Sequence, residues 1–369
     1  MSFLDSVDQP TLLIDENGTR RNIRRMIDRA NANRVDFRPH FKTHQSAAVG
    51  EWFREMGVTK ITVSSVEMAE YFAANGWNDI LIAFSLNPRQ APRINALAEI
   101  IHLEVLIENE EALDAVCKSV RAPLGVWIKI DVGNGRTGLD WQDVDGVSVI
   151  CHRVMQNQQM RLAGLLTHSG HTYHAAETAD VVRIFREGID RLTQLRDRLD
   201  ESDIHGLRIS VGDTPGCTLC DDWRGADEVR PGNFVFYDAM QALAGVCEFE
   251  DVSMALACPV VAKHPERREV VIYGGAIHLS KDHVEVDGKI SYGLTALQQG
   301  ERWGAPIAGA RVDRLSQEHG ILYIPGDEFE KIAVGDLVFI LPAHSCLTVQ
   351  VMGEYYTLKG EKIETLNRP

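Results

Sequence analysis

Three short segments combine residue types that could do covalent chemistry. Lys42 follows the apolar, strand-like run VDFRPHF and precedes a polar stretch that could begin a helix. Arg136 lies in IKIDVGNGRTG, and His168, His171 and Tyr173 lie in LLTHSGHTY. A lysine that is partly shielded from water and close to a guanidinium suits Schiff-base formation with an aldehyde. Lys42 is therefore the candidate nucleophile, and His168 and His171 are candidate acid or base groups.

The segment SVGDTPG, with Gly212, Asp213 and Thr214, predicts a phosphate-binding turn. It follows a strand-like run, and glycine-rich turns of this kind present backbone N–H groups to an anion. The Asp213 carboxylate would repel a phosphate unless its side chain turned away. A Schiff-base lysine and a phosphate turn together suggest pyridoxal 5'-phosphate as the cofactor.

The segment PAHSC predicts a metal site. His344 and Cys346 lie two residues apart on a strand-like run, so their side chains should point to the same face. An imidazole and a thiolate together favour Zn²⁺. Two protein ligands leave positions open for water or substrate, as a catalytic zinc ion needs.

The remaining cysteines predict reduced thiols. The chain has seven cysteines without the spacing of a disulfide framework. Cys217 and Cys220 have a Cys-x-x-Cys spacing, but no second pair accompanies them. We interpret these two as incidental thiols in a helix that starts after the phosphate turn.

Strand-like runs alternate with helical patterns from about residue 15 to residue 240 and would position these groups. One helix, in SSVEMAEYFAANG, has a capping box of Ser64 and Glu67 and ends on Asn75-Gly76. Eight such units, with strands too apolar to have a solvent-exposed face, predict a closed parallel (β/α)8 barrel. The eight predicted strands are 35–41, 60–64, 80–84, 101–106, 124–131, 161–166, 207–211 and 233–237.

In a barrel of this kind, reactive residues lie at the carboxyl ends of the strands. Lys42, Arg136, the two histidines and the SVGDTPG turn follow predicted strands, and Tyr237 ends the eighth. These groups would therefore converge on one mouth.

After about residue 245 the pattern changes to β-branched runs with tight-turn signals. VEVDGKISYG has an Asp-Gly turn, and GDLVFILPAHSCLTVQVMGEYY reads as a long β-rich run. We predict two domains, a barrel over 1–245 and an all-β domain over 246–369. The first residues of the chain are expected to pack on the β domain.

Composition narrows the classes of partner. The chain of 369 residues has a formal charge of −15, which disfavours nucleic acid. The arginines of RRNIRRMIDR alternate with Ile23, Met26 and Ile27 at helical spacing and predict a solvated helix face. Neither a signal peptide nor an apolar run long enough for a membrane span is evident. We expect a cytoplasmic protein with no membrane partner.

Seven segments together resemble one enzyme family. They are RPHFKTHQS, IKIDVGNGRTG, HSGHTY, SVGDTPG, VRPGNFVFYD, SQEHG and LPAHSC. In this order, over nearly the whole chain, they resemble the fold-type III pyridoxal-phosphate enzymes of the D-threonine aldolase and D-serine dehydratase family, relatives of alanine racemase.

The resemblance implies an alanine racemase-like barrel with a β domain, and it implies a homodimer. Lys42 would hold the cofactor, Arg136 would lie near the phenolate oxygen or the substrate carboxylate, and Tyr173 would lie near the pyridine nitrogen. A neutral Tyr173 there makes the cofactor a weaker electron sink, so the metal should share the work. The residues implied near the phosphate are Gly212, Thr214, Gly232 and Asn233, with Asp213 in the same turn.

The predicted function is α,β-elimination of a β-hydroxy D-amino acid, as in D-serine dehydratase, giving a 2-oxo acid and ammonia. Lys42 would take the α-proton, and Zn²⁺ on His344 and Cys346 would polarise the β-hydroxyl. Dehydratase members of the family tend to show His-x-Cys, whereas the aldolases more often show His-x-Asp with harder cations.

Three alternatives remain open. A D-threonine aldolase or 3-hydroxy-D-aspartate aldolase would deprotonate the hydroxyl with His168 or His171 and could use Mn²⁺ or Mg²⁺. An amino-acid racemase would need a second base, for which Tyr292 is the candidate, and would leave His344 and Cys346 unexplained. A non-catalytic carrier of pyridoxal phosphate would leave the β domain without a role.

Overall fold

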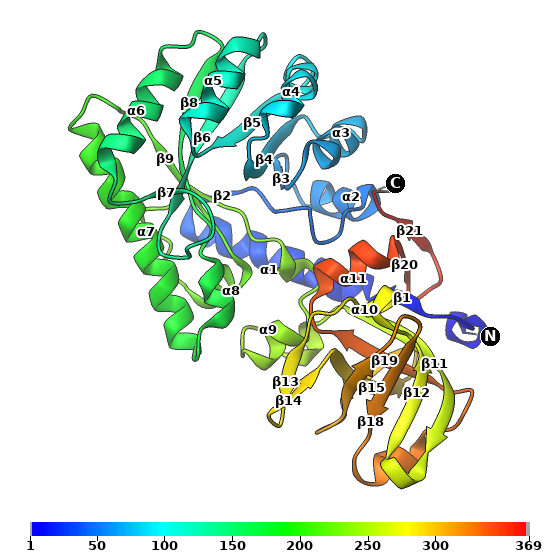
Figure 1. Ribbon diagram of the computed structural model, residues 1–369. Coiled ribbons are helices and arrows are strands. Elements are labelled where there is room, and N and C mark those ends of the chain that lie inside the picture. Colours follow the sequence, from blue (N-terminus) through cyan, green and yellow to red (C-terminus); the bar gives the residue numbers. More distant parts are fainter. Residues whose placement is uncertain (1, 367–369) are drawn as a thin grey trace. The chain divides into compact units, whose positions relative to one another are not determined.

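The computed structural model describes residues 2–366 and divides into two compact units (Figure 1). The parallel-sheet unit comprises Arg25–Lys42 and Gly50–Gly232. The β unit comprises the described residues up to Arg24, the segment Thr43–Val49, and those from Asn233 on. The sequence-based boundary at residue 245 concerns domains and stays a prediction; residues 1 and 367–369 lie outside the described residues.

Within residues 2–366, nine strands form the sheet of the parallel-sheet unit. Eight of them lie in the order β2-β10-β9-β8-β6-β5-β4-β3, and these neighbours pair in parallel. The bounds are β2 Asp36–Phe37, β3 Ile61–Val63, β4 Asp79–Ser85, β5 His102–Ile107, β6 Leu124–Asp131, β8 Met160–Leu166, β9 Arg208–Val211 and β10 Glu228–Val229, with the short β7 Leu139–Asp140 beside β6. The ends of the order meet, because His40 forms a parallel bridge with Thr62. The predicted parallel barrel is confirmed.

One predicted strand is wrong. The eighth strand of the sheet is β10, whereas residues 233–237 begin with a 3₁₀ helix, η4 (Asn233–Val235). Phe234 and Phe236 are fully buried, so the apolar run has the composition of a strand without its hydrogen bonding. Tyr237 consequently follows a turn, in which its N–H donates to the Asn233 carbonyl at 2.8 Å, and has a φ of 49°.

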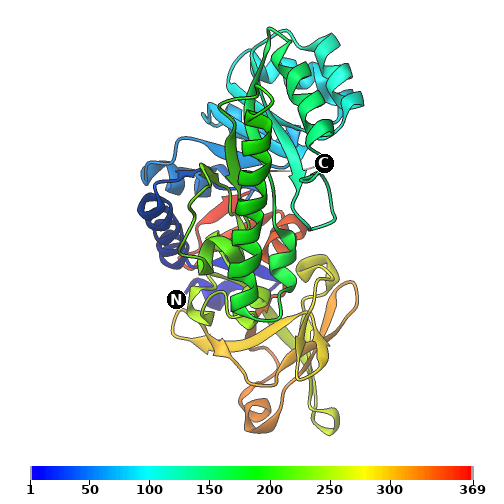
Figure 2. The same cartoon turned by 90° about the vertical axis from the view of Figure 1, so that its left-hand side faces the viewer.

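Helices connect the strands, as the sequence indicates. Their bounds are α1 Glu16–Asn33, α2 Ala47–Glu55, α3 Val66–Ala74, α4 Ala91–Ala98, α5 Glu110–Ser119, α6 Val144–Met155, α7 Thr178–Asp200 and α8 Thr214–Leu219. The longest, α7, is the long green helix in Figure 2. Ile23, Met26 and Ile27 of α1 are buried, which confirms the amphipathic pattern. The cap of α3 is Ser65, whose side chain accepts from the Met68 N–H, and not Ser64 as predicted.

An ion cluster around the buried Arg38 includes residues at the amino ends of β4 and β10. The Arg38 guanidinium lies 2.6 Å from Asp79, 3.2 Å from Glu104 and 2.8 Å from Glu228. Asp79 and Glu228 are the first residues of their strands. This ion cluster satisfies the charges at the amino ends, so chemistry is expected at the carboxyl ends.

The β unit contains a ten-stranded sheet within the described residues. Its strands are β1 Thr11–Ile14, β11 Met254–His264, β12 Glu269–Tyr273, β15 Gly293–Gln299, β16 Arg302–Pro306, β17 Arg311–Leu315, β18 His319–Tyr323, β19 Leu337–Pro342, β20 Glu354–Thr357 and β21 Lys362–Glu364. Strand β1, from the start of the chain, pairs with β11 and β20. The predicted Asp-Gly turn joins β13 (Val284–Val286) to β14 (Lys289–Ser291), with Asp287 and Gly288 at positive φ.

One short helix interrupts the predicted β-rich run near the end of the chain. After β19 the chain forms α11 (Ser345–Met352), and two other short helices in this unit are α9 (Ala239–Leu243) and α10 (Ala276–Leu279). His344 and Cys346 therefore lie at a strand-to-helix junction, and their predicted place on a strand is wrong.

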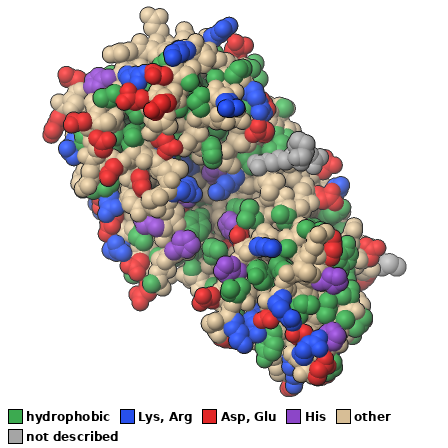
Figure 3. All heavy atoms as spheres, viewed as in Figure 1, with side chains coloured by type: hydrophobic (Ala, Val, Ile, Leu, Met, Phe, Trp, Pro, Cys, Tyr) green, Lys and Arg blue, Asp and Glu red, His purple; other side chains and the backbone are tan. Residues whose placement is uncertain are grey.

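The distribution of charge on the surface and the length of the helices bear on possible partners. Acidic and basic side chains are interspersed on the face seen in Figure 3, without a continuous basic stripe there. Within residues 2–366, none of the helices has both the length and the apolar character needed to cross a membrane.

Candidate active site

The backbone at Lys42 is held in a turn just past the first barrel strand. The Lys42 N–H donates to His40 Nδ1 at 3.3 Å. The preceding residue, Phe41, is buried, and its ring centroid lies 5.0 Å from those of Phe72 and Trp77. Aromatic packing on one side and a local hydrogen bond on the other fix where the partly buried Lys42 side chain begins.

Arg136 lies in a loop between β6 and β7 that one carboxylate organises. Asp131, the last residue of β6, accepts hydrogen bonds from the N–H groups of Gly133, Asn134 and Gly135 at 2.8 to 2.9 Å. Arg136 follows directly and is exposed. The loop is therefore anchored at its start, while the guanidinium is accessible to an anion.

Lys129 is a second candidate lysine, which the sequence interpretation missed. It lies in β6, and its side chain is only 4% exposed. Burial, together with the positive charges of Arg230 and Arg136, lowers the pKa of Lys129 to about 7. Alternation along the strand could have indicated that this residue shares a face with Asp131.

His168 is held as a neutral imidazole of defined tautomer. Its Nδ1 lies 2.7 Å from the Gly212 carbonyl oxygen, which can only accept, so Nδ1 carries the proton and Nε2 can act as a base. Burial first, and then the charge of Lys42, hold the pKa of His168 well below its usual value. Gly212 has a φ of 151°, and a Cβ there would lie 2.6 Å from the Arg230 backbone nitrogen. Glycine is therefore required for this approach.

Asp213 directs its carboxylate to the backbone at the end of the predicted phosphate turn. It caps α8, accepting from the Gly216 N–H at 2.6 Å and from the Thr172 hydroxyl at 2.8 Å. Burial raises the pKa of Asp213 to about 6. These two hydrogen bonds hold the Asp213 carboxylate in place. Asp213 is therefore a residue that shapes the turn.

Tyr173 and His171 lie on η3 (Gly170–His174), which follows β8. The Tyr173 hydroxyl accepts a hydrogen bond from the Thr214 N–H at 3.3 Å. The structure therefore brings Tyr173 to the phosphate turn, and its position beside a pyridine nitrogen stays a prediction. Burial lowers the pKa of His171, and its buried Nδ1 has no hydrogen-bond partner among the described residues.

Gly232 and Asn233 follow β10, with Gly232 half-buried and Asn233 buried. The Asn233 side-chain Nδ2 donates to Asp238 Oδ2 at 2.7 Å and to Ser345 Oγ at 2.9 Å. Both of its amide hydrogens are thus used, so a phosphate contact from Asn233 would have to come from its main chain.

His344 and Cys346 are brought together at the start of α11. Cys346 acts on His344 both by charge and by hydrogen bonding, and Thr43 Oγ1 lies 3.2 Å from the Cys346 sulfur. Burial alone would lower the pKa of His344, but the Cys346 thiolate and Asp238 raise it well above its usual value. Two anionic groups beside an imidazole favour a cation, which fits a divalent metal ion. Within residues 2–366, His, Cys, Asp and Glu side chains form no metal-binding group of three or more.

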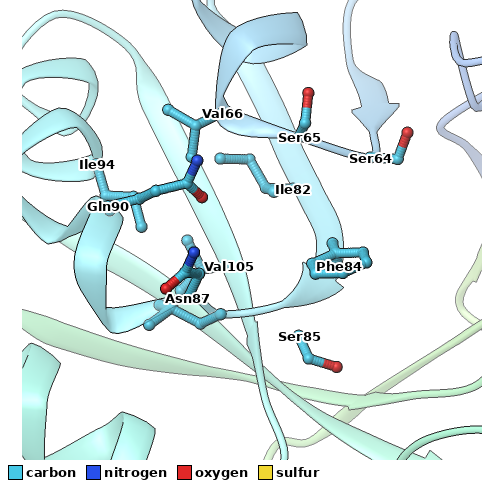
Figure 4. Close-up of a pocket in the computed structure, with 11 residues that line it drawn as sticks. Ser64, Ser65, Val66, Ile82, Phe84, Ser85, Asn87, Gln90, Ile94 and Val105 are labelled. Atoms are coloured by element: carbon cyan, nitrogen blue, oxygen red, sulfur yellow. The ribbon is translucent and has the colours of Figure 1, made fainter.

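A separate cavity of about 230 Å³ opens near the carboxyl ends of β3 and β4 (Figure 4). Ser65, Phe84, Asn87 and Gln90 are among its lining residues, none of which is charged. None of the predicted site residues lines it. The cavity is therefore separate from the candidate site.

Comparison with known families identifies the chain. The family model of the alanine racemase N-terminal domain matches residues 14–239. The chain belongs to this family. A second model, for a domain whose description names serine dehydratase, matches residues 253–358. Both matches agree with the alanine racemase-like fold.

Three curated relatives of this family member match most of its length. D-threo-3-hydroxyaspartate dehydratase from Delftia sp. (strain HT23) is 29% identical, covering 98% of this chain and 97% of the relative. D-serine dehydratase from Dictyostelium discoideum is 27% identical, covering 97% and 95%. D-threonine aldolase from Arthrobacter sp. is 25% identical, covering 92% and 86%.

A solved structure of the Delftia dehydratase matches this alanine racemase-like chain with a TM-score of 0.92 at 29% identity, over 100% of both chains. Two further structures of that enzyme carry a histidine-to-alanine and a cysteine-to-alanine substitution, two positions apart, and the second is described as metal-free. His344 and Cys346 have the same spacing.

Proposed function

We propose that the chain is a lyase that depends on pyridoxal phosphate and a divalent metal ion. It would eliminate water from a β-hydroxy D-amino acid, and hydrolysis of the product would give a 2-oxo acid and ammonia. The observation that carries this proposal is that Thr43, the residue after Lys42, contacts Cys346. Thr43 lies 3.2 Å from the sulfur of Cys346 and is joined by a peptide bond to Lys42. The residue that follows the proposed cofactor lysine thus contacts a proposed metal ligand. The names of the relatives support the same reaction class.

The residues around Lys42 suit a cofactor with a phosphate and a phenolate. Besides burial, which is the main cause, Lys42, Arg136 and Lys129 lower the pKa of His168. Burial, and after it Arg230 and Arg136, likewise lower the pKa of Lys129. Mutually repelling, partly desolvated cations favour an anionic ligand. We propose that Lys42 holds the cofactor covalently, that Arg136 binds an anionic oxygen of cofactor or substrate, and that the Gly212–Thr214 turn and Gly232 hold the phosphate. Pyridoxal phosphate, when bound, supplies an electron sink for the substrate Cα.

His344 and Cys346 would hold the metal ion, and a thiolate with an imidazole favours Zn²⁺ over Mg²⁺. A bound divalent ion would supply Lewis acidity toward the departing β-hydroxyl.

The reacting protons would pass through side chains of the site. The Lys42 amine would take the proton from the substrate Cα, and the electron pair of that C–H bond would form the Cα–Cβ double bond as hydroxide leaves Cβ. Hydrolysis of the resulting enamine gives a 2-oxo acid and ammonia. Arg136 would orient the substrate or cofactor, because a planar guanidinium binds two anionic oxygens at once.

Retro-aldol cleavage is the second candidate, and the His168 tautomer favours it. A neutral imidazole with a free Nε2 lone pair could take the proton of the β-hydroxyl, which breaks the Cα–Cβ bond instead of the Cβ–O bond. The thiolate in the metal pair favours elimination. We therefore place the aldolase second.

Product analysis tests the proposal. The purified protein, with pyridoxal phosphate and Zn²⁺, is incubated with D-serine, D-threonine and 3-hydroxy-D-aspartate. Elimination should give ammonia with pyruvate from D-serine and ammonia with 2-oxobutanoate from D-threonine. Glycine and acetaldehyde from D-threonine without ammonia would replace elimination by the aldolase. Accumulation of L-serine would instead indicate a racemase.

A further inference from the structure

Asp238 is a completely buried carboxylate in the β unit that the sequence interpretation did not select. It caps α9, where its Oδ1 accepts from the Gln241 N–H at 3.0 Å. Its Oδ2 accepts from His344 Nδ1 at 2.9 Å, from Asn233 Nδ2 at 2.7 Å and from the Ser345 N–H at 3.1 Å. One oxygen atom therefore joins three groups from two segments that are far apart in the sequence.

The contact with Asp238 defines the state of the His344 ring. A carboxylate oxygen can only accept, so Nδ1 of His344 carries the proton and Nε2 is the nitrogen that can bind a cation. The negative charge also makes the imidazole a better electron donor to a metal ion. Asp238 would thus act on metal binding through His344 without being a ligand itself.

The same Asp238 oxygen also accepts a hydrogen bond from the side chain of Asn233. Asn233 directly follows Gly232, which is predicted to lie near the cofactor phosphate, and its side chain donates to both Asp238 and Ser345. We propose that Asp238 is a positioning residue of the metal centre, which holds His344 with Nε2 available to the cation and links that ring to Asn233. This inference rests on the proposed function.

The test measures Zn²⁺ affinity by competition with a chromophoric chelator, on the full chain loaded with pyridoxal phosphate. Asp238→Asn keeps the size of the side chain and removes its charge. It should raise the Zn²⁺ dissociation constant at least about tenfold, the range seen when partners of ligating histidines are removed. With Co²⁺ in place of Zn²⁺, absorption from sulfur-to-metal charge transfer should persist, because Cys346 is untouched.

Two variants separate this role from general damage. Asp143→Asn removes the carboxylate of another capping aspartate, which accepts from the Gly146 N–H at 3.0 Å at the start of α6, and should leave Zn²⁺ affinity unchanged. His344→Ala should lose most of the affinity. If His344→Ala binds Zn²⁺ as the wild type does, the proposed metal centre and function fail. If His344→Ala loses Zn²⁺ but Asp238→Asn stays within about twofold of the wild type, only the role of Asp238 fails.

If circular dichroism shows that Asp238→Asn does not fold, another variant tests whether Asp238 positions His344. Asn233→Ala leaves both proposed ligands in place but removes one of the donors that fix Asp238 Oδ2. It should weaken Zn²⁺ binding at least about threefold, in line with the effect of residues that orient a ligand. Wild-type affinity in a folded Asn233→Ala protein would overturn the inference.

Discussion

At the scale of single residues, the surroundings of a charged side chain decide its chemistry. Lys129 and Arg136 are two cations of the candidate site with different surroundings. Lys129 is buried in a strand with a lowered pKa, whereas Arg136 is exposed on a loop. Only the second could be selected from the sequence, because a glycine-rich loop after a strand is visible there and the burial of one lysine is not.

Arg136→Lys should keep the fold but lower kcat/KM at least about tenfold, which is about 1.4 kcal/mol of transition-state stabilisation. An ammonium cannot reproduce the planar, two-point contact of a guanidinium. Steady-state kinetics with D-serine measure the effect, and Arg183→Lys, on the exposed surface of α7, serves as the matched control. Equal kinetics for both variants would make Arg136 an ordinary surface residue.

The lowered pKa of Lys129 predicts a pH dependence of stability. Between about pH 7, the folded value, and the ordinary value of 10.5, the unfolded chain binds more protons at this residue than the folded chain. Its contribution to the free energy of unfolding therefore rises with pH across this window, and the cost of protonated Lys129 is fully present below it.

Denaturant titrations at several pH values measure this slope. The free energy of unfolding of Lys129→Met, relative to that of the wild type, should be higher at pH 7 than at pH 10. For Lys118→Met, at an exposed position of α5, this difference should not change with pH. A difference that is independent of pH for Lys129→Met would mean that this amine is not desolvated in the folded protein.

At the scale of elements, the loops after the barrel strands position the site. Seven of the predicted strands correspond to strands of the sheet, because their apolar runs and flanking turns mark them. Strand β10 was not predicted, because its two residues, Glu228 and Val229, are too few to form a pattern. Helix α11 was not predicted, because CLTVQVM is rich in β-branched residues, which favour strands. Asp238 was not selected as a site residue, because its partner His344 lies 106 residues away along the chain.

The loop between β6 and β7 yields a prediction of its own. Asp131→Asn removes the charge that holds three backbone N–H groups ahead of Arg136, so the guanidinium should be less well placed. We expect kcat/KM to fall at least about threefold, and the effect to shrink in an Arg136→Lys background, because the two residues act as one unit. Additive losses in the double variant would show that Asp131 supports only general stability.

At the scale of the whole molecule, the proposed metal ligands and the proposed cofactor lysine belong to different compact units. His344 and Cys346 lie in the β unit, and Lys42 ends the first segment of the parallel-sheet unit. Each group should therefore be removable without the other. The fold as a whole was predictable from the sequence, because alternating strands and helices followed by β-rich runs leave few other architectures.

Metal removal tests this separation. EDTA should abolish activity while the cofactor absorption, at about 420 nm for a lysine-bound cofactor, largely persists. Zn²⁺ should restore activity better than Mg²⁺, because Mg²⁺ prefers oxygen ligands. Cys346→Asp should shift the preference toward Mn²⁺ or Mg²⁺. Full activity in the metal-free protein would remove the metal from the proposed reaction.

The central claim is that Lys42 holds pyridoxal phosphate, and Lys129 is the lysine most able to contradict it. Sodium borohydride fixes the cofactor irreversibly to the amine that carries it, and peptide mapping by mass spectrometry then identifies the residue. We predict label on the peptide that contains Lys42, and no label or turnover in Lys42→Ala. Label on Lys129 in the wild type would contradict the account.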